Sequence, residues 1–239
     1  MARLTRRELK QDELRSTFEE FEQFAKQRYK EILVVVGIIA AVVGLVGGLK
    51  IYTDRQEAEA SAELGAALRT FRAYVGTPAE GSLVPGELTF PTGREKYQRA
   101  LQQFSEITMK FPRTKAAAIA RYHLGMCQSL LGDQAGAIRT LQEASRASDR
   151  NIASLAHLAL AGELARSGKV AEAAKLYQDL ADRPTTTVPR ATALLAMADA
   201  YRATQPAQAR QIYKRVEKEF GSDRALAETL RQQITSLPK

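Results

Sequence analysis

Cysteine, histidine and tryptophan are scarce in this sequence, which has one cysteine, two histidines and no tryptophan. A single thiol, Cys127, excludes a disulfide within the chain and is compatible with any redox compartment. The sequence also has no phosphate-binding glycine loop, no nucleophile elbow and no HExxH helix. These absences argue against an enzyme and against a bound cofactor.

The chain is basic, with a formal net charge of +8 over 239 residues. A positive excess of this kind favours nucleic acid or anionic lipid as a partner only where it is concentrated on one face. Here the excess is spread thinly, without a dense basic run, an RNA-binding signature or an aromatic platform. We therefore expect no nucleic-acid partner.

One long apolar run stands out near the start of the chain. Ile32 to Leu49 is eighteen residues without a charge, and Ile51 and Tyr52 extend it. As a helix it reaches about 27–30 Å, close to the hydrocarbon thickness of a lipid bilayer. Its four glycines would weaken a buried helix of a soluble protein but are common in membrane helices. Residues 32–52 are therefore predicted to span the membrane, and the thirty residues before them favour an uncleaved signal anchor over a signal peptide.

Lysine and arginine are distributed unequally around this run. Fifteen residues after Lys50 contain only Arg55, whereas the preceding segment holds Arg3, Arg6, Arg7, Lys10, Arg15, Lys26, Arg28 and Lys30. Positive residues stay on the cytoplasmic side of a membrane. We expect residues 1–31 to be a cytoplasmic tail and residues 53–239 to be exported, which in a Gram-negative cell means the periplasm.

The tail and the span each carry a helical pattern. Apolar residues recur at helical spacing in the tail, at Leu14, Phe18, Phe21, Ala25 and Tyr29. They predict an amphipathic helix that lies on the membrane surface or binds a cytoplasmic partner. In the span, Ala40, Gly44 and Gly48 form a stripe of small residues that lets two helices approach closely, so a homodimer is an open alternative.

From residue 94 onward a two-helix layout returns with nearly constant period. Alanines at positions 100, 137, 173 and 209 lie 36 or 37 residues apart. In the strongest copy, Leu124-Gly125 lies in the first helix, Leu131-Gly132-Asp133 forms the turn and Ala137 lies in the second helix. These are the spacings of a tetratricopeptide repeat. The sequence predicts an all-α fold: tail, membrane helix, and a solenoid of three to four helix pairs. An unrelated helical bundle is the alternative.

The two ends of this repeat domain depart from the pattern. Residues 53–74 are expected to supply the first helix of the first repeat. Gly76 to Gly93 contains three prolines and four glycines, so it is predicted to be an irregular loop. Asp223 to Leu237 is expected to form a capping helix, with Ser222 as its N-cap.

Stacked repeats curve, and their first helices line the concave face. On this frame the positions facing the groove are Ile119, Tyr122, Met126, Leu155, Leu158, Arg166, Leu195, Asp199 and Arg202. A mainly apolar groove suits an extended hydrophobic segment or another helix. Tyr122 and Met126 stand where repeats that clamp a terminal carboxylate need lysine and asparagine. His123 and His157 fall on different helices without a third ligand, so no metal site is expected.

With tail, span and repeats in place, the chain resembles bacterial inner-membrane proteins with a periplasmic tetratricopeptide domain, in particular the ancillary subunit of the Sec translocon. Phe104 to Ala144 is also similar to repeats in the periplasmic coordinator of the Tol–Pal system and in barrel-assembly lipoproteins, which lack such an anchor. The resemblance implies translocon subunits, periplasmic chaperones and exported chains as partners. An envelope-assembly or cell-division scaffold with one fixed partner is the alternative. Repeats facing the cytosol, as in an organelle import receptor, are a third.

Overall fold

The computed structural model describes residues 28–76, 88–221 and 224–237. The chain divides into two units, Met1–Arg55 and Gln56–Lys239. Most of the predicted amphipathic tail, residues 1–27, lies outside the described residues, as does the centre of the predicted loop, residues 77–87.

Helix α2 (Tyr29–Arg72) contains the whole predicted span. It is long and apolar enough to cross a membrane. The large apolar side chains from Leu33 to Leu49 are all more than half exposed, so none of them is used in a protein core. The four glycines of the span do not interrupt the helix.

In the second unit, α2 from Gln56 onward packs against α3 (Gly93–Lys110) as the first helix pair. Ala60, Leu64 and Ala67 share one buried core with Ala100 and Phe104. The end of α2 lies two residues before the predicted end at residue 74 because the chain turns into strand β1 (Tyr74–Val75). This strand pairs in parallel with β2 (Thr89–Phe90), a contact that the sequence pattern did not predict.

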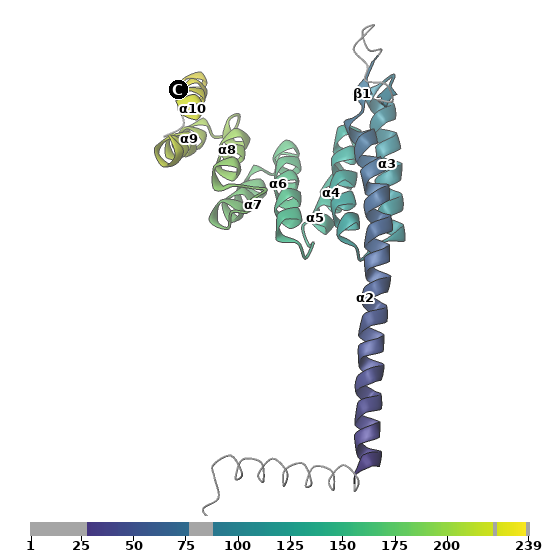
Figure 1. Cartoon of the computed structure of the whole chain (residues 1–239). Coiled ribbons are helices and arrows are strands. Elements are labelled where there is room, and N and C mark those ends of the chain that lie inside the picture. Colours follow the sequence, from purple (N-terminus) through teal and green to yellow (C-terminus); the bar gives the residue numbers. More distant parts are fainter. Residues whose placement is uncertain (1–27, 77–87, 222–223, 238–239) are drawn as a thin grey trace, which may run out of the picture. The chain divides into compact units, whose positions relative to one another are not determined.

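Three further pairs follow, and each helix packs on the next along the chain (Figure 1). Their helices are α4 (Lys115–Leu130) with α5 (Gln134–Ala144), α6 (Arg150–Arg166) with α7 (Val170–Asp182), and α8 (Arg190–Tyr201) with α9 (Pro206–Phe220). Helix α10 (Arg224–Ser236) packs on α9, closes the array and corresponds to the capping helix predicted for Asp223 to Leu237. The predicted N-cap, Ser222, lies outside the described residues. The predicted all-α solenoid is confirmed, with four helix pairs among the described residues.

The alanines that recur every 36 or 37 residues in the sequence occupy equivalent positions in the core. Ala100, Ala137, Ala173 and Ala209 are all fully buried, one in the second helix of each pair. A methyl group at these positions allows two helices to approach closely. Larger residues such as Leu141, Tyr177 and Tyr213 fill the space between successive layers.

The turns inside the second and third pairs are built alike. Gly132 and Gly168 adopt positive φ angles of 86° and 84°, which glycine tolerates without strain. In each turn the next residue donates its backbone N–H to a carbonyl five residues earlier: Asp133 to Gln128, and Lys169 to Leu164, both at 2.9 Å. This hydrogen bond marks a Schellman motif, which ends the first helix of the pair.

Candidate partner-binding groove

The predicted groove residues lie on the first helices of three successive pairs, α4, α6 and α8, except Arg202, which directly follows α8. Helix α4 contacts α6, and α6 contacts α8, so these helices are neighbours in the array. The six apolar candidates are all half-buried, neither enclosed in the core nor freely exposed. Half-burial is the state expected of side chains that line a shallow surface between packed helices.

Several of these side chains pack against cores that neighbouring helices share. Leu155 and Leu158 of α6 pack against the same core as Leu195 of α8. Tyr122 of α4 and Leu158 pack against a core formed by α5, α6 and α7. Ile119 packs instead on the first pair. Five of the six apolar candidates, all except Met126, thus pack against a core, which accounts for their buried part.

A buried carboxylate, that of Glu163, holds the groove residue Arg166 in place at the end of α6. Glu163 is 3 % exposed, and its carboxylate pairs with the exposed guanidinium of Arg166. The same guanidinium donates to the hydroxyl of Ser129 at 3.1 Å, linking α6 to α4. A charge buried to this degree needs a partner because desolvation costs several kcal/mol. Arg166 is therefore held in place by contacts within the protein.

Asp199 makes two polar contacts near the end of α8. Its carboxylate accepts a short hydrogen bond from the hydroxyl of Tyr213 in α9 and lies 3.8 Å from the guanidinium of Arg202. Burial, and then this hydrogen bond, raise the pKa of Tyr213. Burial also raises the pKa of Tyr122. Both phenols are therefore neutral donors at physiological pH.

The cysteine and the first histidine lie in the core of the early repeats. Cys127 is fully buried, and burial raises the pKa of its thiol to about 12, so it carries no nucleophilic thiolate. His123 stacks on Phe104 at 5.2 Å and meets Phe71 edge-on at 5.1 Å. Burial, with a contribution from Arg72, lowers the pKa of His123 to about 4. Within the described ranges no group of three His, Cys, Asp or Glu side chains is placed to hold a metal ion.

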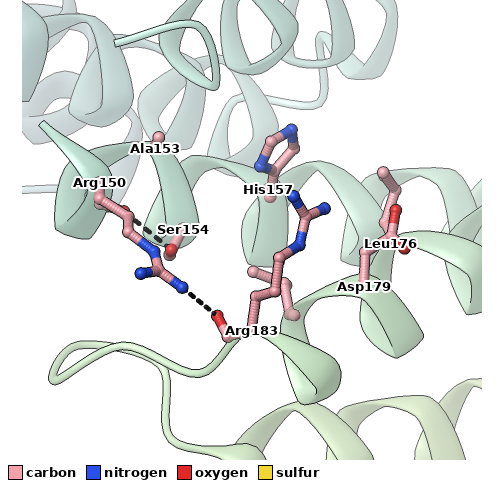
Figure 2. Close-up of a pocket in the computed structure, with 8 residues that line it drawn as sticks. Arg150, Ala153, Ser154, His157, Leu176, Asp179 and Arg183 are labelled. Atoms are coloured by element: carbon pink, nitrogen blue, oxygen red, sulfur yellow. Dashed lines mark hydrogen bonds between the residues drawn. The ribbon is translucent and has the colours of Figure 1, made fainter. Parts of the chain in front are cut away.

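A second hollow, which the sequence did not predict, lies between α6 and α7. It has a volume of about 340 Å³ and is lined by Arg150, His157, Leu176, Asp179, Leu180 and Arg183, among others. Figure 2 shows the Arg183 side chain reaching toward His157, while Arg150 bonds to the Arg183 carbonyl oxygen. No sequence signal marks this site, because its residues come from two helices and have no motif spacing.

Two segments of the chain, residues 120–146 and 192–222, match the tetratricopeptide repeat family. These two segments are therefore similar to tetratricopeptide repeats. The matched segments cover most of α4 with α5, and most of α8 with α9. The pair α6–α7 between them has the same glycine turn and buried alanine. No curated protein and no solved structure matches the chain.

Proposed function

We propose that this chain is a single-pass protein of the bacterial inner membrane whose repeat domain binds protein segments and catalyses no reaction. Residues 32–52 are its anchor in the bilayer, residues 1–31 face the cytoplasm, and residues 53–239 face the periplasm. The observation that carries the proposal is the tetratricopeptide match, on helix pairs that follow one helix long and apolar enough to cross a membrane. Tetratricopeptide repeats are protein-interaction modules.

The character of the groove favours hydrophobic clients. Tyr122, Met126, Leu158 and Leu195 contribute half-buried apolar surface, while charge is present mainly at Arg166 and Asp199, which are already paired. Such a surface binds extended apolar segments and does not require a charged terminus on the bound peptide. In this proposal the domain works beside the Sec translocon and passes emerging chains to periplasmic chaperones.

A scaffold role is the second candidate. Outside the helix's own backbone, a Cβ atom added at Gly44 or Gly48 would have no described atom within 4 Å, so no described residue packs on the small-residue stripe with Ala40. A second copy of the helix packed there would make the chain a homodimer that recruits one fixed partner in envelope assembly or cell division.

The topology is tested by thiol labelling of intact cells. Because Cys127 is buried, the native chain is expected to react slowly and is the control. The exposed Ser148 is replaced in the variant Ser148→Cys, and a membrane-impermeant maleimide is added. Labelling without lysis, once the outer membrane is permeable, is expected. Labelling only after lysis would overturn the orientation and favour repeats that face the cytosol.

The partner is tested by photocrosslinking in cells, with probes at Tyr122, Leu158 and Arg202 and a control probe at exposed Lys175 on α7. Crosslinks to translocon subunits and many exported chains from the three groove positions, and not from Lys175, are expected. A single envelope-assembly protein would replace the export role with the scaffold role. Equal crosslinking from Lys175 would remove the groove as the contact surface.

A further inference from the structure

The hollow between α6 and α7 is a separate feature from the groove. It lies at the start of α6 and the end of α7, and its residues are Arg150 and His157 from α6 and Leu176, Asp179 and Leu180 from α7, with Arg183 just after α7. Its volume of about 340 Å³ is that of a site for a small group.

Two guanidinium groups of this hollow form no ion pair with the described residues. Arg150 donates to the backbone carbonyl oxygen of Arg183 at 3.4 Å, and neither arginine lies within 4.0 Å of a carboxylate in the described part of the chain. Some other arginines of the domain do have a carboxylate partner: Arg190 lies 3.1 Å from Glu219 and Arg231 lies 2.8 Å from Glu217. Arg150 and Arg183 therefore keep charged donors for a group from outside.

Apart from Asp179, the other polar groups nearby are already hydrogen-bonded or neutral. The N-terminal amides of α6 are taken by its own cap, since Asp149 accepts from Asn151 at 2.8 Å and from Ile152 at 3.3 Å. Burial lowers the pKa of His157, so the imidazole is uncharged at neutral pH. The two arginines and Asp179 leave the hollow with one net positive charge.

The other residues that line the hollow limit the shape and charge of a ligand that fits it. Leu176 and Leu180 provide an apolar wall for a short aliphatic stem. Asp179 disfavours two negative charges on one compact group, as in a phosphate, because like charges at short range oppose binding. A carboxylate brings one negative charge into the hollow, and a second carboxylate at the far end of an aliphatic stem lies farther from Asp179. A planar carboxylate also matches the fork of a guanidinium group.

We propose that this hollow binds a carboxylate on a short aliphatic stem, held by Arg150 and Arg183. The chemistry is that of a glutamate side chain in a bound protein segment or of a free dicarboxylate of similar size. The site does not depend on the groove or on the compartment of the domain, so its failure would leave the proposed function intact.

The test uses the full chain in lipid nanodiscs and ligand-observed NMR. Three ligands are compared: a blocked Gly-Glu-Gly peptide, the same peptide with glutamine, and glutarate. The glutamate peptide is expected to bind at least about tenfold more tightly than the glutamine peptide, since a charge-assisted hydrogen bond is lost. Equal binding of the two peptides would overturn the proposal.

Variants then locate the site. Arg183→Gln and Arg150→Gln are each expected to weaken carboxylate binding about tenfold. Asp179→Asn is expected to tighten it, a result that loss of folding does not produce. Lys175→Gln removes an exposed charge from the same helix as Asp179 and is the control. If the Arg183→Gln and Lys175→Gln variants bind the carboxylate with equal affinity, the hollow is not the binding site.

The two sources of the carboxylate give different results. A glutamate peptide that binds while glutarate competes poorly identifies a protein segment, because the peptide backbone then contributes. Glutarate that binds as well as the peptide identifies a free dicarboxylate. Binding must also weaken as salt is raised, because the attraction is screened by ions.

Discussion

The carboxylate of Glu57 in α2 accepts the backbone N–H of Lys115, the first residue of α4, at 2.7 Å. Its other oxygen accepts the N–H of Ala116 at 3.0 Å, and the Thr114 side chain accepts that of Ala117 at 3.1 Å. The first three amides of α4, which have no partner within the helix, are thereby satisfied. A negative charge here also opposes the positive end of the helix dipole.

Replacing Glu57 should therefore loosen the first two helix pairs from each other. Glu57→Ala is expected to lower the free energy of unfolding by about 1–2 kcal/mol, because two charge-assisted bonds at a partly exposed position are lost. The measurement is urea denaturation of the full chain in detergent. Glu59→Ala, at an exposed neighbour in α2 with no side-chain bond to the described residues, is the control. Equal losses in the two variants would show that the cap contributes nothing.

Gly125 makes the close contact between α4 and α5. A Cβ atom added there would lie 2.7 Å from Cγ of Leu141, which is fully buried and has no room to move. Gly125→Ala is expected to destabilise the protein by about 1–3 kcal/mol through overpacking, despite the better helix propensity of alanine.

A second helical glycine provides the matched control for this variant. At Gly162 in α6 the added Cβ would lie 3.7 Å from the hydroxyl of Tyr177, an ordinary contact. Gly162→Ala is expected to leave stability unchanged or to raise it by up to about 1 kcal/mol. Thermal unfolding of the two variants side by side checks both. A Gly125→Ala variant as stable as Gly162→Ala would contradict the role of Gly125.

The sequence predicted the features that depend on local period and failed on those that depend on distant contacts. The buried alanines and Gly132 recur with the repeat, so their burial and turn geometry follow from spacing. The bond from Glu57 to Lys115 joins residues 58 apart, and the bond from Arg150 to Arg183 joins residues 33 apart. Neither pair has a composition or motif that singles it out.

The groove residues stand between these two cases. Their places on α4, α6 and α8 follow from the repeat frame, and the structure puts them on adjacent helices. Period alone did not show that Leu155, Leu158 and Leu195 also pack against a core. How much of such a side chain is buried between helices, and how much stays exposed, depends on the angle between the neighbouring helices. The local sequence pattern does not determine that angle.

His123 makes stability depend on pH. Its pKa of about 4 in the folded protein lies below the ordinary value of 6.5. The unfolded chain therefore binds more protons between these values, and stability is lost as the pH falls from about 6.5 toward 4. The Nδ1 atom is buried without a hydrogen-bond partner, so a neutral ring of similar shape is tolerated.

His123→Phe tests this dependence, because phenylalanine retains the stacking on Phe104 and cannot titrate. At pH 7 the variant is expected to be as stable as the native protein or more so. At pH 4.5 it should be more stable by an amount of the order of 1–2 kcal/mol, in unfolding experiments at matched salt. Parallel pH profiles for the two proteins would mean that His123 titrates normally in the fold.

Arg166 has a structural task that must be separated from any contact with a partner. Arg166→Ala leaves the buried carboxylate of Glu163 without a positive partner and is expected to cost about 2–3 kcal/mol of stability. In the double variant Glu163→Gln with Arg166→Ala no charge is left unpaired, so most of that loss should be recovered. Lys169→Ala, at an exposed cation just beyond the same helix, should change stability by less than about 0.5 kcal/mol.

The double variant then reports on binding in a stable background. If Arg166 contacts the partner, crosslinking from the probe at Leu158 should fall in the double variant although its unfolding midpoint matches that of the native chain. Unchanged crosslinking would assign Arg166 to the support of Glu163 alone and leave the apolar side chains to bind the partner. If the double variant is instead as unstable as Arg166→Ala, the loss of stability does not come from an unpaired Glu163 carboxylate. Contacts other than the one with Arg166 would then compensate the buried charge of Glu163.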